Sequence, residues 1–228
     1  MSYLSDNLNE IHARIDSACE RSGRQKSDVL LIAVSKTKPV SLLEEAYQNG
    51  IRDFGENRVQ EMSQKAELMP DDIRWHMIGH LQKNKVKPAV KYAYMIHSVD
   101  SLALAKEISD EAVKQAKTIP ILLEVNVAGE ESKFGYSASE VLTDISLIAS
   151  LPNIKIKGLM TIAPFTDIPE SNRCYFQQLK ELSVDIRNKN IDNVDMDILS
   201  MGMSGDFEIA IEEGAGMVRV GTSIFGER

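Results

Sequence analysis

The stretch Val29-Leu-Leu-Ile-Ala-Val-Ser-Lys36 is an apolar run that ends in a serine and a lysine. Its length and its Val, Ile and Leu content are typical of a strand buried on both faces in a parallel sheet. Side chains alternate along a strand, so Leu30, Ile32, Val34 and Lys36 share one face. An open doubly wound sheet would carry a Gly-x-Gly-x-x-Gly turn after its first strand, but the turn here reads Lys-Thr-Lys-Pro.

Seven further apolar runs follow this one, and helical patterns separate them. The eight predicted strands occupy residues 29–35, 51–54, 74–78, 94–99, 121–127, 154–160, 196–200 and 217–220. The segments between them have room for helices, for example over residues 41–48, 101–117 and 139–149. Regular alternation of strands and helices indicates parallel strands joined by crossovers. Eight such units predict an α/β fold, a closed (β/α)8 TIM barrel.

A helix is predicted before the first strand. Apolar residues recur there at steps of four and three residues, at Leu4, Leu8, Ile11, Ile15 and Ala18, and the pattern ends near Gly23. Only residues 221–228 follow the last predicted strand, too few for an eighth outer helix. We therefore expect residues 1–23 to cover the final gap of the barrel, in a single domain over residues 1–228.

The composition excludes several classes of function. A formal net charge of -8 over 228 residues argues against sequence-independent binding to nucleic acid. Cys19 and Cys174 are isolated, which excludes a disulfide framework or a thiolate zinc site and favours a reducing, cytoplasmic location. No signal peptide pattern and no run of ~18 apolar residues is present, so no membrane association is expected.

Lys36 is the first candidate for chemistry. It falls on the inward face of its strand, at the carboxyl end, where barrel enzymes carry their active sites. Apolar walls and the nearby Lys38 would lower the pKa of its amine, and a neutral amine attacks carbonyl groups. An isolated lysine at such a boundary is more often simply solvated, so the assignment depends on the residues around it.

Arg219 is the second candidate, because it alternates with Val218 and Val220 and so points into the barrel. A buried guanidinium is costly unless it is paired. An inward Arg219 therefore requires either a carboxylate partner or a ligand near the mouth, and the sequence leaves both readings open.

The segment Ser200-Met-Gly-Met-Ser-Gly-Asp206 is predicted to be a turn between the seventh strand and a helix over residues 207–213. Its two glycines, together with Gly221-Thr-Ser223 after the last strand, suit the phosphate cradle that barrels build from their last two loops. The alternative is an ordinary loop in which Ser204 or Asp206 caps the helix.

Asn57 follows the second strand and can reach the same mouth, or it can cap the next helix. His76 and His80 are four residues apart but lie across a strand and its turn, so a metal pair is not expected. We expect His76 to be structural and His80 to lie near the mouth.

Taken together, these segments resemble the pyridoxal-phosphate homeostasis protein family, whose fold is similar to the barrel domain of alanine racemase. Six motifs carry the resemblance in order along the chain: Leu31-Ile-Ala-Val-Ser-Lys-Thr-Lys-Pro39, Phe54-Gly-Glu-Asn-Arg-Val-Gln-Glu61, Trp75-His-Met-Ile-Gly-His-Leu-Gln-Lys-Asn-Lys85, Gly158-Leu-Met-Thr161, Ser200-Met-Gly-Met-Ser204 and Val218-Arg-Val-Gly-Thr-Ser-Ile-Phe-Gly226.

The resemblance implies that Lys36 holds pyridoxal 5'-phosphate (PLP) as a Schiff base and that Arg219 faces the pyridine nitrogen. It further implies a set of residues around the cofactor: Ser200, Gly221 and Thr222 at the phosphate, with Asn57 and the Met201-Gly202 backbone lining the site. The implied function is intracellular vitamin B6 cofactor homeostasis.

The resemblance also bears on catalysis. Arginine at the ring nitrogen disfavours a pyridinium and so weakens the cofactor as an electron sink. Racemases of the related fold use a tyrosine from a second domain as the opposite base, and the chain ends at Arg228 without that domain. We therefore expect a monomer that binds PLP without turnover, and apo forms of PLP enzymes as recipients. A racemase-like PLP enzyme and a cofactor-free class I aldolase are the alternatives.

Overall fold

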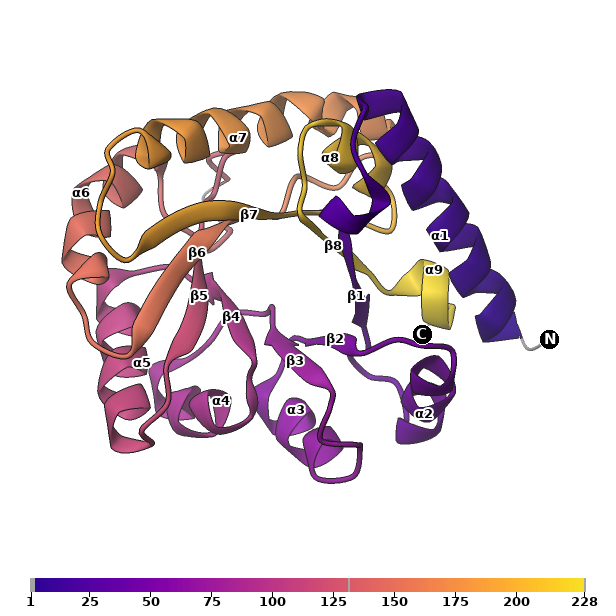
Figure 1. Cartoon of the computed structure of the whole chain (residues 1–228), viewed down its shortest axis with the longest axis horizontal. Helices are drawn as coiled ribbons and strands as arrows, with labels where there is room; N and C mark the ends of the chain where they lie inside the picture. The colour runs from indigo at the N-terminus through magenta and orange to yellow at the C-terminus, as the bar shows by residue number, and fades with distance from the viewer. Residues whose placement is uncertain (1–2, 131, 228) are drawn as a thin grey trace.

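The computed structural model describes residues 3–130 and 132–227, so Met1, Ser2, Glu131 and Arg228 lie outside it. Within these ranges eight parallel strands close into a barrel in chain order, and the last strand pairs with the first. The strands are β1 (Leu30–Val34), β2 (Asp53–Glu56), β3 (Arg74–Met77), β4 (Met95–Val99), β5 (Ile119–Glu124), β6 (Ile154–Met160), β7 (Val194–Met203) and β8 (Met217–Val220). The predicted (β/α)8 barrel is confirmed (Figure 1).

Helices surround the barrel on the outside (Figure 1). They are α1 (Tyr3–Ser22), α2 (Val40–Gln48), α3 (Val59–Ala66), α4 (Val86–Tyr92), α5 (Leu102–Lys114), α6 (Ala138–Ala149), α7 (Arg173–Arg187), α8 (Phe207–Glu212) and α9 (Thr222–Phe225), with short 3-10 turns at Lys26–Asp28, Lys83–Lys85 and Pro169–Asn172. α9 is a single turn, so residues after β8 do not supply a full outer helix.

The first helix covers the gap beside the last strand, as its periodicity predicts. Its buried residues are Leu4, Leu8, Ile11, Ile15, Ala18 and Cys19. It packs against α8 and α9, where Arg14 forms an ion pair with Glu208 at 2.8 Å and the Asn7 amide donates to the Ile224 carbonyl at 2.9 Å. Figure 1 shows α1 alongside both helices.

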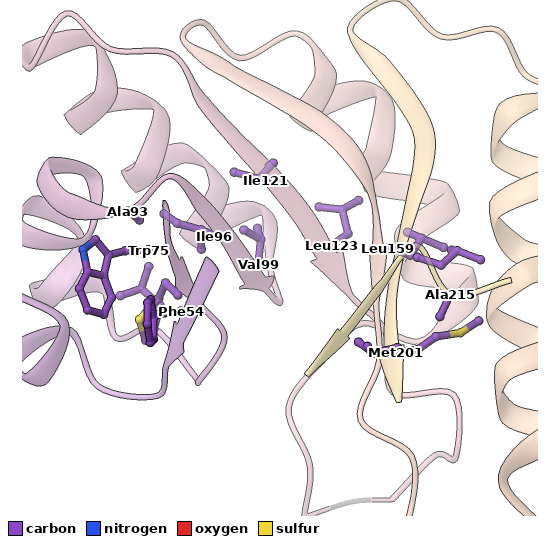
Figure 2. Close-up of a cluster of buried hydrophobic side chains, with 14 of the residues drawn as sticks. Phe54, Trp75, Ala93, Ile96, Val99, Ile121, Leu123, Leu159, Met201 and Ala215 are labelled. Carbon is purple, nitrogen blue, oxygen red and sulfur yellow. The ribbon is translucent and has the colours of Figure 1, made fainter. Parts of the chain in front are cut away.

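Apolar side chains form two layers, one on each face of the barrel wall. The small inner layer consists of Ile32, Met95, Leu122, Met160 and Met217. The large outer layer lies between strands and helices, and Figure 2 shows part of it, including Phe54 tilted against Trp75. In β1, Ile32 belongs to the inner layer and Leu31 and Ala33 to the outer one, which confirms the predicted phase.

The predicted turn over residues 200–206 is wrong in its first half, because β7 continues to Met203. Two pairings extend the strand: Met160 of β6 lies opposite Ser200, and Arg219 of β8 lies opposite Met203 after a register shift. Met201 is fully buried in the outer layer (Figure 2). Only residues 204–206 remain as the connection to α8.

Two other strands differ from prediction by two or more residues at an end. β2 begins and ends two residues later than predicted, at Asp53 and Glu56. Both carboxylates are buried, but Arg74 binds Asp53 and Lys65 binds Glu56 at 2.7 Å, so these polar residues are tolerated inside a strand. β5 spans residues 119–124 rather than 121–127, and beyond it Val125 forms an isolated bridge with Tyr136.

Candidate functional site

A cavity of about 590 Å³ opens at the carboxyl ends of the strands. Residues that are far apart in the sequence meet there, because every strand of a parallel barrel ends on the same face. Five of the predicted site residues line the cavity: Lys36, Asn57, Arg219, Gly221 and Thr222. The structure therefore brings together the predicted lysine, the predicted arginine and the loop after β8.

The other three predicted residues, Ser200, Met201 and Gly202, do not line this cavity. Ser200 is fully buried below it, and Met201 points into the outer layer. A side chain at Gly202 would meet Ala210 Cβ at 2.6 Å, so this glycine serves close packing against α8. Because β7 extends to Met203, the loop between β7 and α8 begins later in the sequence than predicted. The cavity is therefore lined by residues 203–206.

Lys36 is half-buried at the point where β1 ends, and the backbone just before it is firmly anchored. The Ser35 hydroxyl donates to Glu56 Oε1 at 2.6 Å, and Lys65 Nζ donates to the Ser35 carbonyl at 2.7 Å. Lys65 also pairs with Glu56 at 2.7 Å. This buried network fixes the backbone from which the Lys36 side chain extends.

The residues after Lys36 form an unusual turn. Thr37 has a φ of 65°, which is a strained conformation for a β-branched residue. Its N–H donates to Glu61 Oε1 at 2.6 Å, which compensates the strain locally. Lys38 Nζ donates to the carbonyls of Phe225 and Gly226 at 3.2 and 3.0 Å, so its amine is turned to the end of the chain.

Arg219 is only 4% exposed, and its guanidinium lines the cavity. Nη1 donates to Ser200 Oγ at 2.6 Å and Nη2 donates to the Thr161 carbonyl at 2.7 Å. Burial lowers its pKa to about 10, against the opposing charges of Glu124 and Asp206, so it stays cationic at neutral pH. Its hydrogen-bond acceptors among the described residues are uncharged, so the cation is available to a ligand in the cavity.

Glu124 is a cavity residue that the sequence analysis missed. It lies at the carboxyl end of β5 and is 7% exposed. Burial raises its pKa to about 7, as does the nearby charge of Asp100, while Arg219 acts in the opposite direction. The alternation of side chains along the strand could have identified it. Glu124 lies two residues after the inward-facing Leu122 and so shares its face of the strand, as Lys36 shares the face of Ile32.

This pKa leads to a prediction for stability. The pKa of Glu124 rises from 4.5 to about 7 on folding, so the fold favours the protonated acid and becomes less stable as pH increases between these values. The shift corresponds to about 3 kcal/mol. Relative to wild type, Glu124→Gln should gain up to about 3 kcal/mol in unfolding free energy between about pH 4 and about pH 8. Denaturant unfolding across this range measures it, and a constant difference between the two proteins would contradict it.

The loops after β7 and β8 contact each other at the cavity. The Gly221 N–H donates to Ser204 Oγ at 3.2 Å. A side chain at Gly221 would approach the Val34 carbonyl to 3.1 Å, whereas Gly205 faces open space. Hydroxyl groups of Ser204 and Thr222 and the N–H groups of these short loops offer donors to an anionic group.

Of the two histidines that the sequence singled out, His80 lies near the mouth as predicted. His80 lines the cavity, stacks on Phe134 with ring centroids 3.6 Å apart, and contacts Asp100 at 3.1 Å. His76 is fully buried inside the barrel. Among residues 3–130 and 132–227, no group of three His, Cys, Asp or Glu side chains is arranged to hold a metal ion, and no helix is long and apolar enough to span a membrane.

Comparison with known proteins places this geometry in a family. The model of the family "Alanine racemase, N-terminal domain" matches residues 7–228. The "Pyridoxal phosphate homeostasis protein" of Aquifex aeolicus is 45% identical over 224 residues, covering 98% of this chain and 97% of that protein. The chain belongs to the pyridoxal phosphate homeostasis protein family. The Escherichia coli member is 36% identical, covering 100% of this chain and 98% of its own length. The resemblance inferred from the six sequence motifs is confirmed.

Two solved structures have a similar fold. PipY of Synechococcus elongatus, in a structure described as having PLP bound, has a TM-score of 0.85 at 34% identity, covering 98% of this chain and all (100%) of that one. Alanine racemase of Clostridium difficile has a TM-score of 0.80 at 15% identity, and the match covers 99% of this chain but 56% of the racemase chain. The racemase similarity shows the shared barrel fold.

Proposed function

We propose that this protein binds pyridoxal 5'-phosphate on Lys36 and serves in intracellular homeostasis of that cofactor. The observation that carries the proposal is the meeting of Lys36, Arg219 and the β7 and β8 loops in one cavity. PipY, with PLP in its described structure, and the relatives named for PLP homeostasis support it.

The donor set fits the three reactive parts of the cofactor. The cofactor would supply an aldehyde, and Lys36 would hold it covalently through its side-chain amine. Arg219 is the cation at the inner end of the cavity and suits the ring nitrogen as a hydrogen-bond donor. Ser204, Gly221 and Thr222 suit the phosphate, so Ser204 takes the role that the resemblance assigned to Ser200.

The charge of Arg219 favours storage over catalysis. With a pKa of about 10 it remains a guanidinium at neutral pH, so it can donate a hydrogen bond to the ring nitrogen but cannot accept one from a protonated ring nitrogen. The ring nitrogen would then stay uncharged and withdraw electrons weakly, which would make amino-acid chemistry at the bound cofactor slow. The proposed site therefore retains the cofactor without turnover of its own. In this proposal the protein is a cytoplasmic monomer that releases the cofactor to apo forms of PLP enzymes.

Glu124 favours a second candidate, a racemase-like PLP enzyme. β5 lies opposite β1 in the closed barrel, so Glu124 and Lys36 enter the cavity from opposite walls. Its pKa of about 7 would let it exchange a proton near neutral pH. A base on the face opposite to the lysine is the element that racemisation requires.

One experiment separates the two candidates. The PLP-loaded protein is incubated with a panel of amino acids, and chiral products are measured together with activation of an added apo-enzyme. Homeostasis predicts activation of the apo-enzyme and no substrate-saturable turnover. Saturable racemisation that Lys36→Ala abolishes, and that Glu124→Gln lowers by about 10²–10⁴-fold, would establish the enzyme instead.

A further inference from the structure

A continuous row of hydrogen-bonded side chains crosses the barrel interior beneath the cavity. Its members come from five strands, in the order Asp53 (β2), His76 (β3), His97 (β4), Ser200 (β7) and Arg219 (β8). His76 Nε2 lies 2.9 Å from Asp53 Oδ1, and His76 Nδ1 lies 2.9 Å from His97 Nε2. His97 Nδ1 lies 3.0 Å from Ser200 Oγ, which Arg219 Nη1 contacts at 2.6 Å.

The two ends of the row carry opposite charges. Burial alone would raise the pKa of Asp53, but hydrogen bonds from Arg74 and His76 outweigh it and lower that pKa, so the carboxylate is ionised. Arg74 Nε donates to Asp53 Oδ1 at 2.7 Å from the amino-terminal rim of the barrel. At the cavity end, Arg219 can only donate.

For two neutral imidazoles, these fixed ends determine the direction of every hydrogen bond between them. Ionised Asp53 accepts, so His76 carries its proton on Nε2 and presents a lone pair on Nδ1. His97 must then donate from Nε2, which leaves its Nδ1 to accept the Ser200 hydroxyl proton. The Ser200 oxygen in turn accepts from Arg219. Complete burial lowers the pKa of His97 well below its ordinary value, and the charge of Arg219 acts in the same direction, so His97 stays neutral as this order requires.

We propose that this row is a one-way hydrogen-bond relay that orients the Arg219 guanidinium in the cavity, with His97 and Ser200 as its positioning residues. The Thr161 carbonyl holds the second guanidinium nitrogen at 2.7 Å, so relay and carbonyl together fix the plane of the group. The step from an oriented Arg219 to the ring nitrogen of bound PLP rests on the proposed function. The relay itself does not.

The rest of the interior supports a functional reason for this polar row. The neighbouring inward positions carry Ile32, Met95, Leu122, Met160 and Met217. Replacing buried polar groups by well-packed apolar ones is often neutral or stabilising, so stability alone does not require two histidines in the lumen. Each member of the row is at most 4% exposed, so bulk water does not supply its hydrogen bonds.

The first test is made on the cofactor-free protein. Long-range proton–nitrogen correlation spectra of the imidazole rings report which nitrogen carries the proton. The relay predicts that His76 and His97 are both neutral and both protonated on Nε2. A proton on Nδ1 of either ring, or an imidazolium at neutral pH, would overturn the relay.

The second test measures the consequence in the cavity. His97→Leu removes both ring nitrogens, and Ser200→Ala removes the direct contact to Arg219. Each should weaken PLP binding about tenfold and shift the absorption spectrum of the bound cofactor. His97→Gln keeps one donor and one acceptor and should restore both readouts. Ser109→Ala is the control, since Ser109 is an equally buried serine in α5 that donates to the Pro152 carbonyl at 2.5 Å.

The outcomes distinguish the relay from the proposed function. Predicted tautomers without any PLP binding would leave the relay standing and refute the homeostasis function. Unchanged affinity and spectrum in Ser200→Ala and His97→Leu would refute the relay's role while the function stands. If His97→Leu does not fold, Ser200→Ala and the tautomer spectra still decide the question.

Discussion

We expect Lys36→Ala to abolish covalent retention of PLP, and borohydride reduction of the loaded wild-type protein to label Lys36 alone. The expectation follows from the position of Lys36 at the end of β1, facing the cavity with Arg219 and the β8 loop. Loss of the amine removes the only group assigned to the aldehyde, so the effect is complete rather than graded. Absorbance spectra before and after reduction, with mapping of the labelled peptide, measure it.

Lys38→Ala is the matched control, since Lys38 also lines the cavity and lies two residues away. Its amine is engaged by carbonyls near the end of the chain, so we expect normal labelling of Lys36 in this variant. Lys36→Ala should fold with a stability change of about 1 kcal/mol or less, because the Ser35, Glu56 and Lys65 network is left intact. A label on Lys38, or unchanged spectra in Lys36→Ala, would contradict the assignment.

We expect Gly158→Ala to destabilise the fold severely. Gly158 lies in β6, opposite Ile198 of β7, where the pairing register of the two strands shifts. A Cβ atom there would lie 1.8 Å from the Ile198 carbonyl oxygen, and the φ of 154° is unfavourable for a side chain. The clash is between backbone and Cβ, so no rotamer relieves it. We expect a loss of more than about 4 kcal/mol in unfolding free energy, measured by urea denaturation.

Gly216→Ala is the control for this substitution. Its nearest atom would lie at 3.7 Å, an ordinary van der Waals distance, and its φ is not positive. This variant should keep nearly wild-type stability. A Gly158→Ala protein that unfolds at the wild-type denaturant concentration would show that β6 and β7 can separate without cost.

The barrel was predictable because its signals are local. Each strand is a short run whose alternation places one set of side chains inward, and Ile32, Met217 and Arg219 all lie on the face that the sequence pattern indicates. The same alternation placed Lys36 at a carboxyl end. The periodic apolar residues of α1 likewise predicted which face of that helix is buried.

The loop contacts of the candidate site were less predictable, because strand ends depend on partners. β7 runs to Met203 because β8 pairs with it beyond Ser200, so Ser204 rather than Ser200 lines the cavity. The glycine at position 202 suggested a turn, whereas its positive φ serves close packing against Phe207 and Ala210. Glu124 was missed because its strand was expected to continue to residue 127.

By itself, the sequence determined the order of strands and helices, the face on which each strand residue lies and the lysine at the end of β1. Only the tertiary structure decided which inward polar residues meet. His97 and Ser200 are 103 positions apart, and no local pattern relates them. Their hydrogen bond exists because barrel closure brings β4 and β7 to a shared lumen, where buried polar groups must find partners in one another.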